Sequence, residues 1–362
     1  MGLGKSKILS QAAAAAADSN FEPFIWTGNA TERSVTGVGI AADMVWFKSR
    51  TQGNYNPKIV DTVRGLNGGT VMENVYTSLS NAQANDNGFR SLDADGFSVA
   101  DSGDGNNDTI NYVGWFFKGG GSSNIYNVDG TGYNTSAGAG LTSGTINPSG
   151  ASVNTAAGFS IIEYIATGTT ATVAHGLSSA PELILSKTTS AAYDWLVYAA
   201  PVGATKQMRL NATTGANTSG FMNNTAPTNS VYTVASGNNL NYANGDVNVA
   251  YCFHSVAGVQ KVGSYTGNGS TTGTSVTTGF EPRFLLIKSS TSAGTNWTIL
   301  DKARTPNNPM ENDLKANSSA AEQTGTGNNY PQATTSATGF QVNTTDGAVN
   351  GSGETYIYLA IA

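Results

Sequence analysis

The chain has 362 residues and a formal net charge of −6, and 12% of its residues are charged, against about 25% in typical soluble domains. It contains no strong run of basic residues, so it lacks the electrostatic footprint of a protein that binds duplex nucleic acid. Its single cysteine, Cys252, excludes an intrachain disulfide and a cysteine-based zinc cluster. No apolar run approaches the ~18 residues that cross a membrane.

The first 20 residues contain the one convincing helix-forming stretch, KSKILSQAAAAAA (residues 5–17). Alanine has the highest intrinsic helix propensity, but a short alanine helix is marginal alone in water. We therefore expect residues 1–20 to form a helical arm that lies against a partner and acts as an anchor. A frayed tail is the alternative.

A repeated stretch follows and recurs at residues 27–48, 166–187 and 265–288. Each copy has a Thr-Gly start, a run rich in Ser and Thr, a Gly-apolar pair, and an apolar run that ends in lysine. Self-similarity at this spacing determines the architecture. The final lysines (Lys48, Lys187 and Lys288) are interpreted as solvated strand ends.

The repeats predict an all-β protein. Short apolar runs alternate with turns rich in Gly, Asn and Asp, which is typical of antiparallel β-sandwiches of jelly-roll or concanavalin-like form. We expect three tandem sandwich domains at residues 21–118, 158–255 and 256–362. Solenoid repeats are shorter, so the domains should be separate, like beads on a string. Residues 119–157, rich in Gly, Ser and Asn, are predicted to be a flexible linker or an extended arm.

Two pairs of charged residues occupy matching places in the first and third repeats. Asp61 and Arg64 correspond to Asp301 and Arg304, and each pair is predicted to form a local ion pair at a strand end. Tryptophans next to strands could stack on sugars, but we expect them to be core residues: Trp46, Trp195 and Trp297. Cys252 is likewise expected to be a small core residue.

Catalytic motifs are not evident, and we expect no enzymatic activity. His175 and His254 are interpreted as polar turn residues, and G-x-S-x-G does not occur in a strand–turn–helix context. Five aspartates fall within residues 93–108, in turn sequence where aspartate often bonds its own backbone. The sharper hypothesis is a calcium loop. Its ligands would be Asp101, Asp104 and Asp108, although the spacing DSGDGNND departs from an EF-hand.

Several motifs together carry a family resemblance: YTGNGS, TGFEPRFLLIK, NWTILD, GFQV and YIYLAIA, with NTAAGFSIIEY and VAHGLSSAPELILSK. Over about residues 21–362 the chain resembles the repeat domains of marine and cyanobacterial bacteriophage virion proteins, often described as tail-fibre-like or lectin-like. The resemblance implies an array of β-sandwiches on the surface of a phage particle, made in the host cytoplasm, with no catalytic residues.

The expected function is that of a non-enzymatic virion surface protein, a tail fibre or appendage, anchored through its N-terminal arm. Its sandwich loops would contact the host surface or a glycan, because binding residues concentrate on loops. A capsid decoration protein is the alternative, and a polysaccharide depolymerase is less favoured. The expected partners are capsid or tail subunits and further copies of the chain, for example in a trimer, with no nucleic acid, membrane or cofactor other than calcium.

Overall fold

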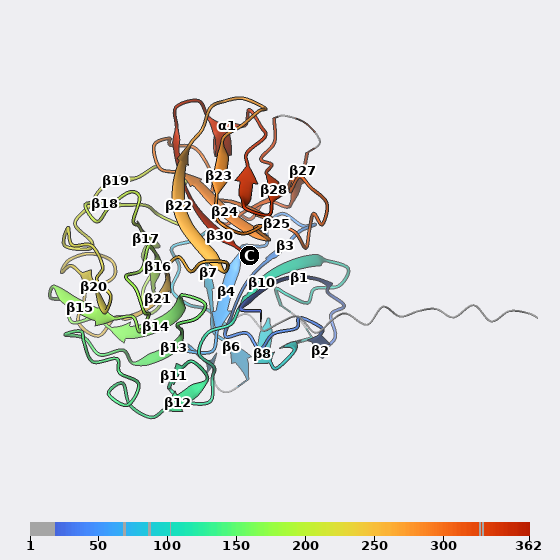
Figure 1. The fold of residues 1–362 in the computed structure, drawn as a ribbon. Helices are drawn as coiled ribbons and strands as arrows, with labels where there is room; N and C mark the ends of the chain where they lie inside the picture. The colour runs from blue at the N-terminus through green and yellow to red at the C-terminus, as the bar shows by residue number, and fades with distance from the viewer. Residues whose placement is uncertain (1–18, 68–69, 86–87, 102, 326, 328) are drawn as a thin grey trace, which may run out of the picture.

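The computed structural model describes residues 19–67, 70–85, 88–101, 103–325, 327 and 329–362 (Figure 1). In these ranges the protein consists of strands and loops, with one four-residue helix, α1 (Gly347–Asn350). The predicted all-β class is therefore confirmed. The predicted N-terminal helix lies outside the described residues. Three lobes surround a common centre, and we call residues 21–118, 158–255 and 256–362 units one, two and three.

Unit one consists of a large and a small antiparallel sheet. The large sheet runs from edge to edge through β1 (Phe21–Thr27), β10 (Asn111–Phe117), β3 (Met44–Ser49), β4 (Lys58–Asp61) and β7 (Asn74–Tyr76). The small sheet contains β2 (Arg33–Thr36), β9 (Gly96–Val99) and β8 (Phe89–Asp93). A two-stranded hairpin, β5 (Leu66–Asn67) and β6 (Val71–Met72), lies beside them.

Units two and three repeat this order. In unit two the large sheet contains β14 (Phe159–Ile165), β21 (Val247–Phe253), β16 (Leu183–Thr188) and β17 (Leu196–Ala199). The smaller pairs are β15 (Ala171–Ala174) with β20 (Val231–Val234), and β18 (Lys206–Gln207) with β19 (Asn217–Thr218). Unit three has β22 (Gln260–Thr266), β30 (Thr355–Ile361), β24 (Phe284–Ser289), β25 (Thr298–Asp301), β26 (Asn312–Lys315) and β27 (Gln323–Thr324). Its small sheet contains β23 (Ser275–Thr277), β29 (Gly339–Gln341) and β28 (Thr334–Ser336).

Residues 119–157 form part of unit two's large sheet and are not a free linker. They contribute β12 (Thr131–Tyr133), β11 (Tyr126–Val128) and β13 (Gly150–Asn154), and β13 pairs with β14 along its length. The β11–β12 hairpin turns at Asp129 and Gly130, whose φ angles are 49° and 83°. An Asp-Gly pair with two positive φ angles is a favoured hairpin turn, and this signal was present in the sequence.

Strands of the large sheets are buried on both faces. In β3, Val45 and Phe47 belong to a cluster between the two sheets of unit one, whereas Met44 and Trp46 point to the opposite face. Successive side chains of a strand alternate between faces, so both layers must be covered to bury such a strand. This explains why the third strand of each unit is buried along its whole length: MVWFKS, LILSKT and FLLIKS.

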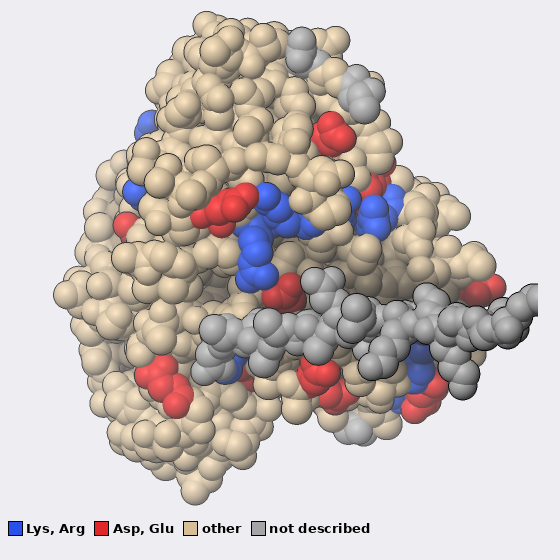
Figure 2. Space-filling model, turned by 45° about the vertical axis from the view of Figure 1, so that its right-hand side comes forward, with Lys and Arg blue, Asp and Glu red and all other residues tan. Residues whose placement is uncertain are grey.

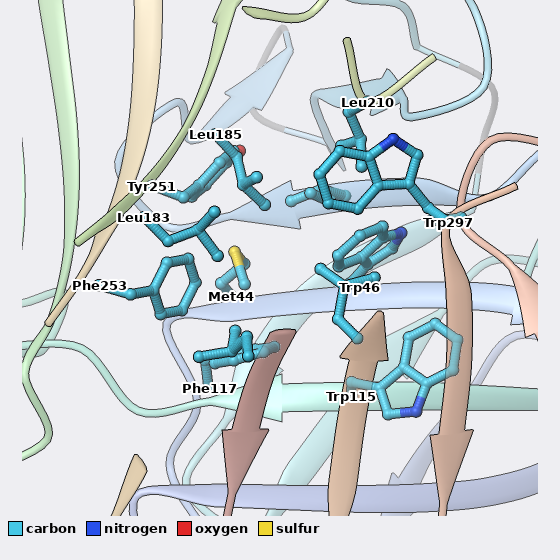
Figure 3. Close-up of a cluster of buried hydrophobic side chains, with 14 of the residues drawn as sticks. Met44, Trp46, Trp115, Phe117, Leu183, Leu185, Leu210, Tyr251, Phe253 and Trp297 are labelled. Atoms are coloured by element: carbon cyan, nitrogen blue, oxygen red, sulfur yellow. The ribbon is translucent and has the colours of Figure 1, made fainter. Parts of the chain in front are cut away.

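The second covering layer is supplied by the other units. A central cluster draws on the outer faces of all three large sheets, as Figure 3 shows for some of its members. The whole cluster includes Met44, Trp46, Trp115, Phe117, Leu183, Leu185, Tyr251, Phe253, Phe284, Leu286, Leu359 and Ile361. The units therefore share one core, and the expectation of separate domains on a string was wrong. The predicted core tryptophans (Trp46, Trp195 and Trp297) are at most 2% exposed, and Cys252 is buried as expected.

Candidate functional site

The predicted calcium ligands lie in the loop before β10. Asp104 pairs with Lys58 (Oδ2–Nζ 2.5 Å), and this lysine is buried. Asp101 and Asp108 are exposed. Within the described residues, no group of three or more His, Cys, Asp or Glu side chains could hold a metal ion. Calcium binding stays a prediction, and it would compete with the ion pair to Lys58.

A repeated asparagine organises this loop, and the sequence analysis missed it. Asn106 donates to the carbonyl oxygens of Ala100 (2.6 Å) and Thr31 (2.8 Å). Its counterparts Asn241 and Asn350 each accept a backbone N–H from the loop opposite. All three side chains are buried. The signal was an asparagine at nearly constant distance before the last strand of each unit.

Both histidines are buried rather than displayed in turns. Nδ1 of His175 accepts the N–H of Leu177 (3.1 Å), so its proton is on Nε2, which donates to the carbonyl of Thr228 (3.0 Å). Burial lowers the pKa of His175 to about 4, which leaves it neutral at ordinary pH. His254 lies 3.3 Å from the hydroxyl of Ser178. These contacts join neighbouring loops of unit two.

The three repeat lysines were wrongly predicted to be solvated. Lys48, Lys187 and Lys288 are each at most 1% exposed. Each ammonium reaches the backbone of a neighbouring unit: Lys48 donates to Ser318 (2.5 Å), Lys187 to Ser80 (3.2 Å) and Lys288 to Thr213 (3.2 Å). Desolvation lowers the pKa of Lys48 to about 7, and that of the other two to about 8.

These contacts run round the molecule in one direction. Unit one bonds to unit three, unit two to unit one, and unit three to unit two. Two tryptophans follow the same path, because Trp195 donates to the carbonyl of Tyr76 (2.8 Å) and Trp297 to that of Arg209 (2.9 Å). The repeated residues thus bind the units together, which is why they recur.

The two predicted Asp–Arg ion pairs are present and fully buried. Nε of Arg64 lies 2.6 Å from Oδ2 of Asp61, and the same distance separates Arg304 from Asp301. Each aspartate also accepts a hydrogen bond from a neighbouring unit. The hydroxyl of Tyr251 donates to Oδ2 of Asp61 (2.7 Å).

The second pair forms a larger network between units three and one. The indole of Trp115 donates to Asp301 (2.9 Å). Arg304 also lies 3.3 Å from Glu322, whose carboxylate forms a two-pronged contact with Arg50 of unit one (2.8 and 2.9 Å). Figure 2 shows Lys, Arg, Asp and Glu side chains gathered in the middle of one face, with most of the remaining surface neutral.

Unit two has no such pair. Strand pairing places Asp61 opposite Met44 and Ala199 opposite Leu183, so Ala199 occupies the position of the aspartate. The residue that corresponds to Tyr251 is Leu359 of unit three. Ala199 and Leu359 both belong to the central cluster. At this position two of the three contacts between units are therefore polar, and the third is apolar.

A cavity of about 440 Å³ lies where residues 119–157 leave unit one. Its lining includes Asp43, Lys118, Asp129 and Asn154. Asp43 accepts the N–H groups of Gly119 (2.8 Å) and Gly121 on one oxygen, and burial raises its pKa. The carboxylate thus fixes the backbone where the chain leaves unit one.

The loop end of unit two has a different character, because an aromatic side chain is displayed there. Tyr242 is 57% exposed, and its ring centre lies 5.6 Å from that of Tyr193. Three loops meet at this end, at residues 166–170, 189–194 and 235–246. Asn241 accepts the N–H groups of Thr167 (2.9 Å) and Gly168 (3.0 Å), which joins the first loop to the third.

A family model matches nearly the whole chain. No curated protein and no solved structure matches the chain. A family model described as a domain of unknown function, DUF7483, matches residues 17–362. The match extends across all three units and the shared core between them. The chain therefore belongs to the DUF7483 family.

Proposed function

We propose that this protein is a non-enzymatic surface protein of a bacteriophage particle. Each unit would be a β-sandwich of jelly-roll or concanavalin-like form, and the three would act as one rigid body whose outer loops contact the host surface. The N-terminal arm would anchor this body to a capsid or tail subunit. The motif resemblance to phage virion repeat domains supplies the biological setting.

One observation carries the proposal. The features repeated between units form contacts that hold the body together. They are the lysines, the Asp–Arg pairs and the loop asparagines. The loop ends differ from unit to unit. A protein built this way can vary its contact surface without loss of its scaffold, as loop-borne recognition on a rigid frame requires.

The packing favours a particular version of this function. A fibre projects its domains along a line, whereas here all three large sheets converge on one central cluster. A compact three-lobed body suits a cap or a decoration protein seated on the particle. We therefore place capsid decoration ahead of an extended fibre.

Immunogold labelling of purified particles that carry the chain tests the proposal. Label on the head would support decoration, and label on the tail or its tip would support an appendage. Particles free of label, with the protein present only in the lysate of infected cells, would overturn the virion role. Release of reducing sugar from polysaccharide by the purified protein would overturn the non-enzymatic assignment.

A further inference from the structure

We propose that the loop end of unit two is a carbohydrate-binding site, with Tyr193 and Tyr242 as its aromatic platform and neutral hexoses as its ligands. The assignment rests on the proposed contact function and names its ligand class. The two rings are tilted by 53° at a centre-to-centre distance of 5.6 Å, and one of them is more than half exposed. An exposed ring offers an apolar face to the C–H side of a pyranose, while its hydroxyl stays in water.

The fold does not require Tyr242. It follows Asn241, and the residues that follow the equivalent asparagines are Asn107 in unit one and Gly351 in unit three. Those positions complete the same loop without an aromatic ring. Of the ring pairs formed by described residues, the Tyr193–Tyr242 pair is the one that contains an exposed ring. Its presence in unit two alone is what a binding residue predicts.

The surroundings of the pair are polar and carry no exposed cation from the same three loops. Thr167, Thr169, Ser190 and Asn244 are exposed and offer hydroxyl and amide groups, the donors and acceptors that match sugar hydroxyls. Lys187, at the end of the neighbouring strand, is buried and bonded inward to Ser80 and Thr188.

The charged side chains near the tyrosine pair favour neutral over acidic sugars. Asp246 lies in the third loop, where it accepts from Ala243 (3.3 Å) and from Ser190 (3.3 Å). Asp194 lies in the second loop, 3.1 Å from Arg209. The Asp194–Arg209 pair is neutral, Asp246 adds one carboxylate and the chain carries a net charge of −6, so acidic glycans are disfavoured. The site therefore suits neutral hexoses.

Bracing between the loops holds the platform in place before a ligand arrives. Gly245 donates to the carbonyl of Ala166 (2.9 Å), and Ala166 donates to that of Asp246 (2.8 Å). Ser190 accepts the N–H of Val247 (3.0 Å), which ties the second loop to the third. A preformed site loses less conformational freedom on binding, which favours affinity.

A glycan array with the full chain, followed by calorimetry on the best ligand, tests the inference. Retention of neutral hexose glycans is expected. Tyr242→Ala should weaken binding at least about tenfold, and Tyr242→Phe by less than about threefold, because the ring face matters more than the hydroxyl. Tyr330→Ala is the matched control, since Tyr330 is a 41% exposed tyrosine of unit three. Unchanged melting temperatures would show that the variants are folded.

Three outcomes would overturn the inference: no neutral glycan bound by the intact chain, binding of acidic glycans alone, or equal affinity in the wild type and Tyr242→Ala. These outcomes can be distinguished from a failure of the proposed virion role. Particles labelled by antibody whose protein binds no glycan would leave the virion role standing without this site. A glycan-binding protein missing from particles would leave the site standing without the virion role.

Discussion

At one set of corresponding positions, units one and two meet through a buried ion pair and a tyrosine (Asp61, Arg64 and Tyr251), whereas units two and three have Ala199 and Leu359, both members of the central cluster. We call the first contact the polar joint and the second the apolar joint. Their strands are arranged in the same way, but the side chains at this position are charged or polar in one and apolar in the other. Where the aspartate is absent, its hydrogen-bonding partner is absent too. The positions change as a set, because a buried charge or hydroxyl left without its partner is costly.

The polar joint does not have to be the stronger one. Bringing two charges out of water costs several kcal/mol per ion, and their attraction in the interior repays this only with good geometry and further hydrogen bonds. Ala199 and Leu359 avoid the cost of a buried ion pair, although the same joint buries the ammonium of Lys288. Either polar or apolar side chains can hold neighbouring units together, provided that every buried charge or hydroxyl has its partner.

Removal of one partner from the polar joint should have the largest effect. Asp61→Ala leaves the guanidinium of Arg64 fully buried without its carboxylate, and Tyr251 without its acceptor. The free energy of unfolding should fall by roughly 3–5 kcal/mol. Guanidinium denaturation or calorimetry would measure the loss. A change of less than about 1 kcal/mol would contradict the view that the ion pair is a complete buried set.

Conversion of the whole joint is the sharper control. The variant Asp61→Ala with Arg64→Val and Tyr251→Leu gives this joint the residues of the apolar joint, where Val202 takes the place of the arginine. No buried charge is left behind, so the triple variant should be more stable than Asp61→Ala alone, despite its two extra substitutions. A triple variant less stable than the single one would show that the two joints are not interchangeable.

The lysine at the apolar joint should give an intermediate, pH-dependent effect. Burial lowers the pKa of Lys288 to about 8, whereas an unfolded lysine titrates near 10.4. Below pH 8 both states hold the proton and the folded state bears the cost of the buried ammonium. Above it the unfolded state binds more protons, so Lys288 alone should add about 2 kcal/mol to the free energy of unfolding between pH 7 and pH 9.5.

Comparison of wild type with Lys288→Met across this range isolates the contribution of Lys288, because the variant loses that part of the rise while Lys48 and Lys187 keep theirs. Melting temperatures from pH 7 to pH 9.5 supply the measurement. Lys206→Met, which replaces an exposed lysine, is the control. If wild type and Lys288→Met follow the same pH trend, the buried ammonium does not contribute as described.

The joints also show how far the sequence could lead. The Asp–Arg pairs were predictable because both partners lie three residues apart in the chain. The lysines were misread because their acceptors, such as Ser80 for Lys187, are distant in sequence and come from another unit. The sequence around a lysine that follows an apolar run is the same whether its ammonium donates to water or to a carbonyl of another unit.

The shared core had a signal that the repeat pattern obscured. The run MVWF has no polar alternation, and a strand of that kind needs cover on both faces. The small sheet of a unit can bury only one face of its large sheet, so another unit had to bury the second face. The outer loops offered no comparable signal. The sequence does not distinguish Tyr242 from the other tyrosines unless its neighbour Asn241 is recognised as the repeated asparagine.

Removal of a single hydroxyl from the polar joint should have the smallest effect. Tyr251→Phe loses the bond to Asp61 but leaves the ion pair with Arg64 in place, so the free energy of unfolding should fall by about 1–2 kcal/mol. Tyr232→Phe is the matched control. Tyr232 is also a buried tyrosine of unit two, and its hydroxyl has no hydrogen-bond partner among the described residues. Loss of that hydroxyl should be neutral or stabilising. Equal shifts in melting temperature for the two variants would mean that Tyr251 acts at the joint through its ring alone.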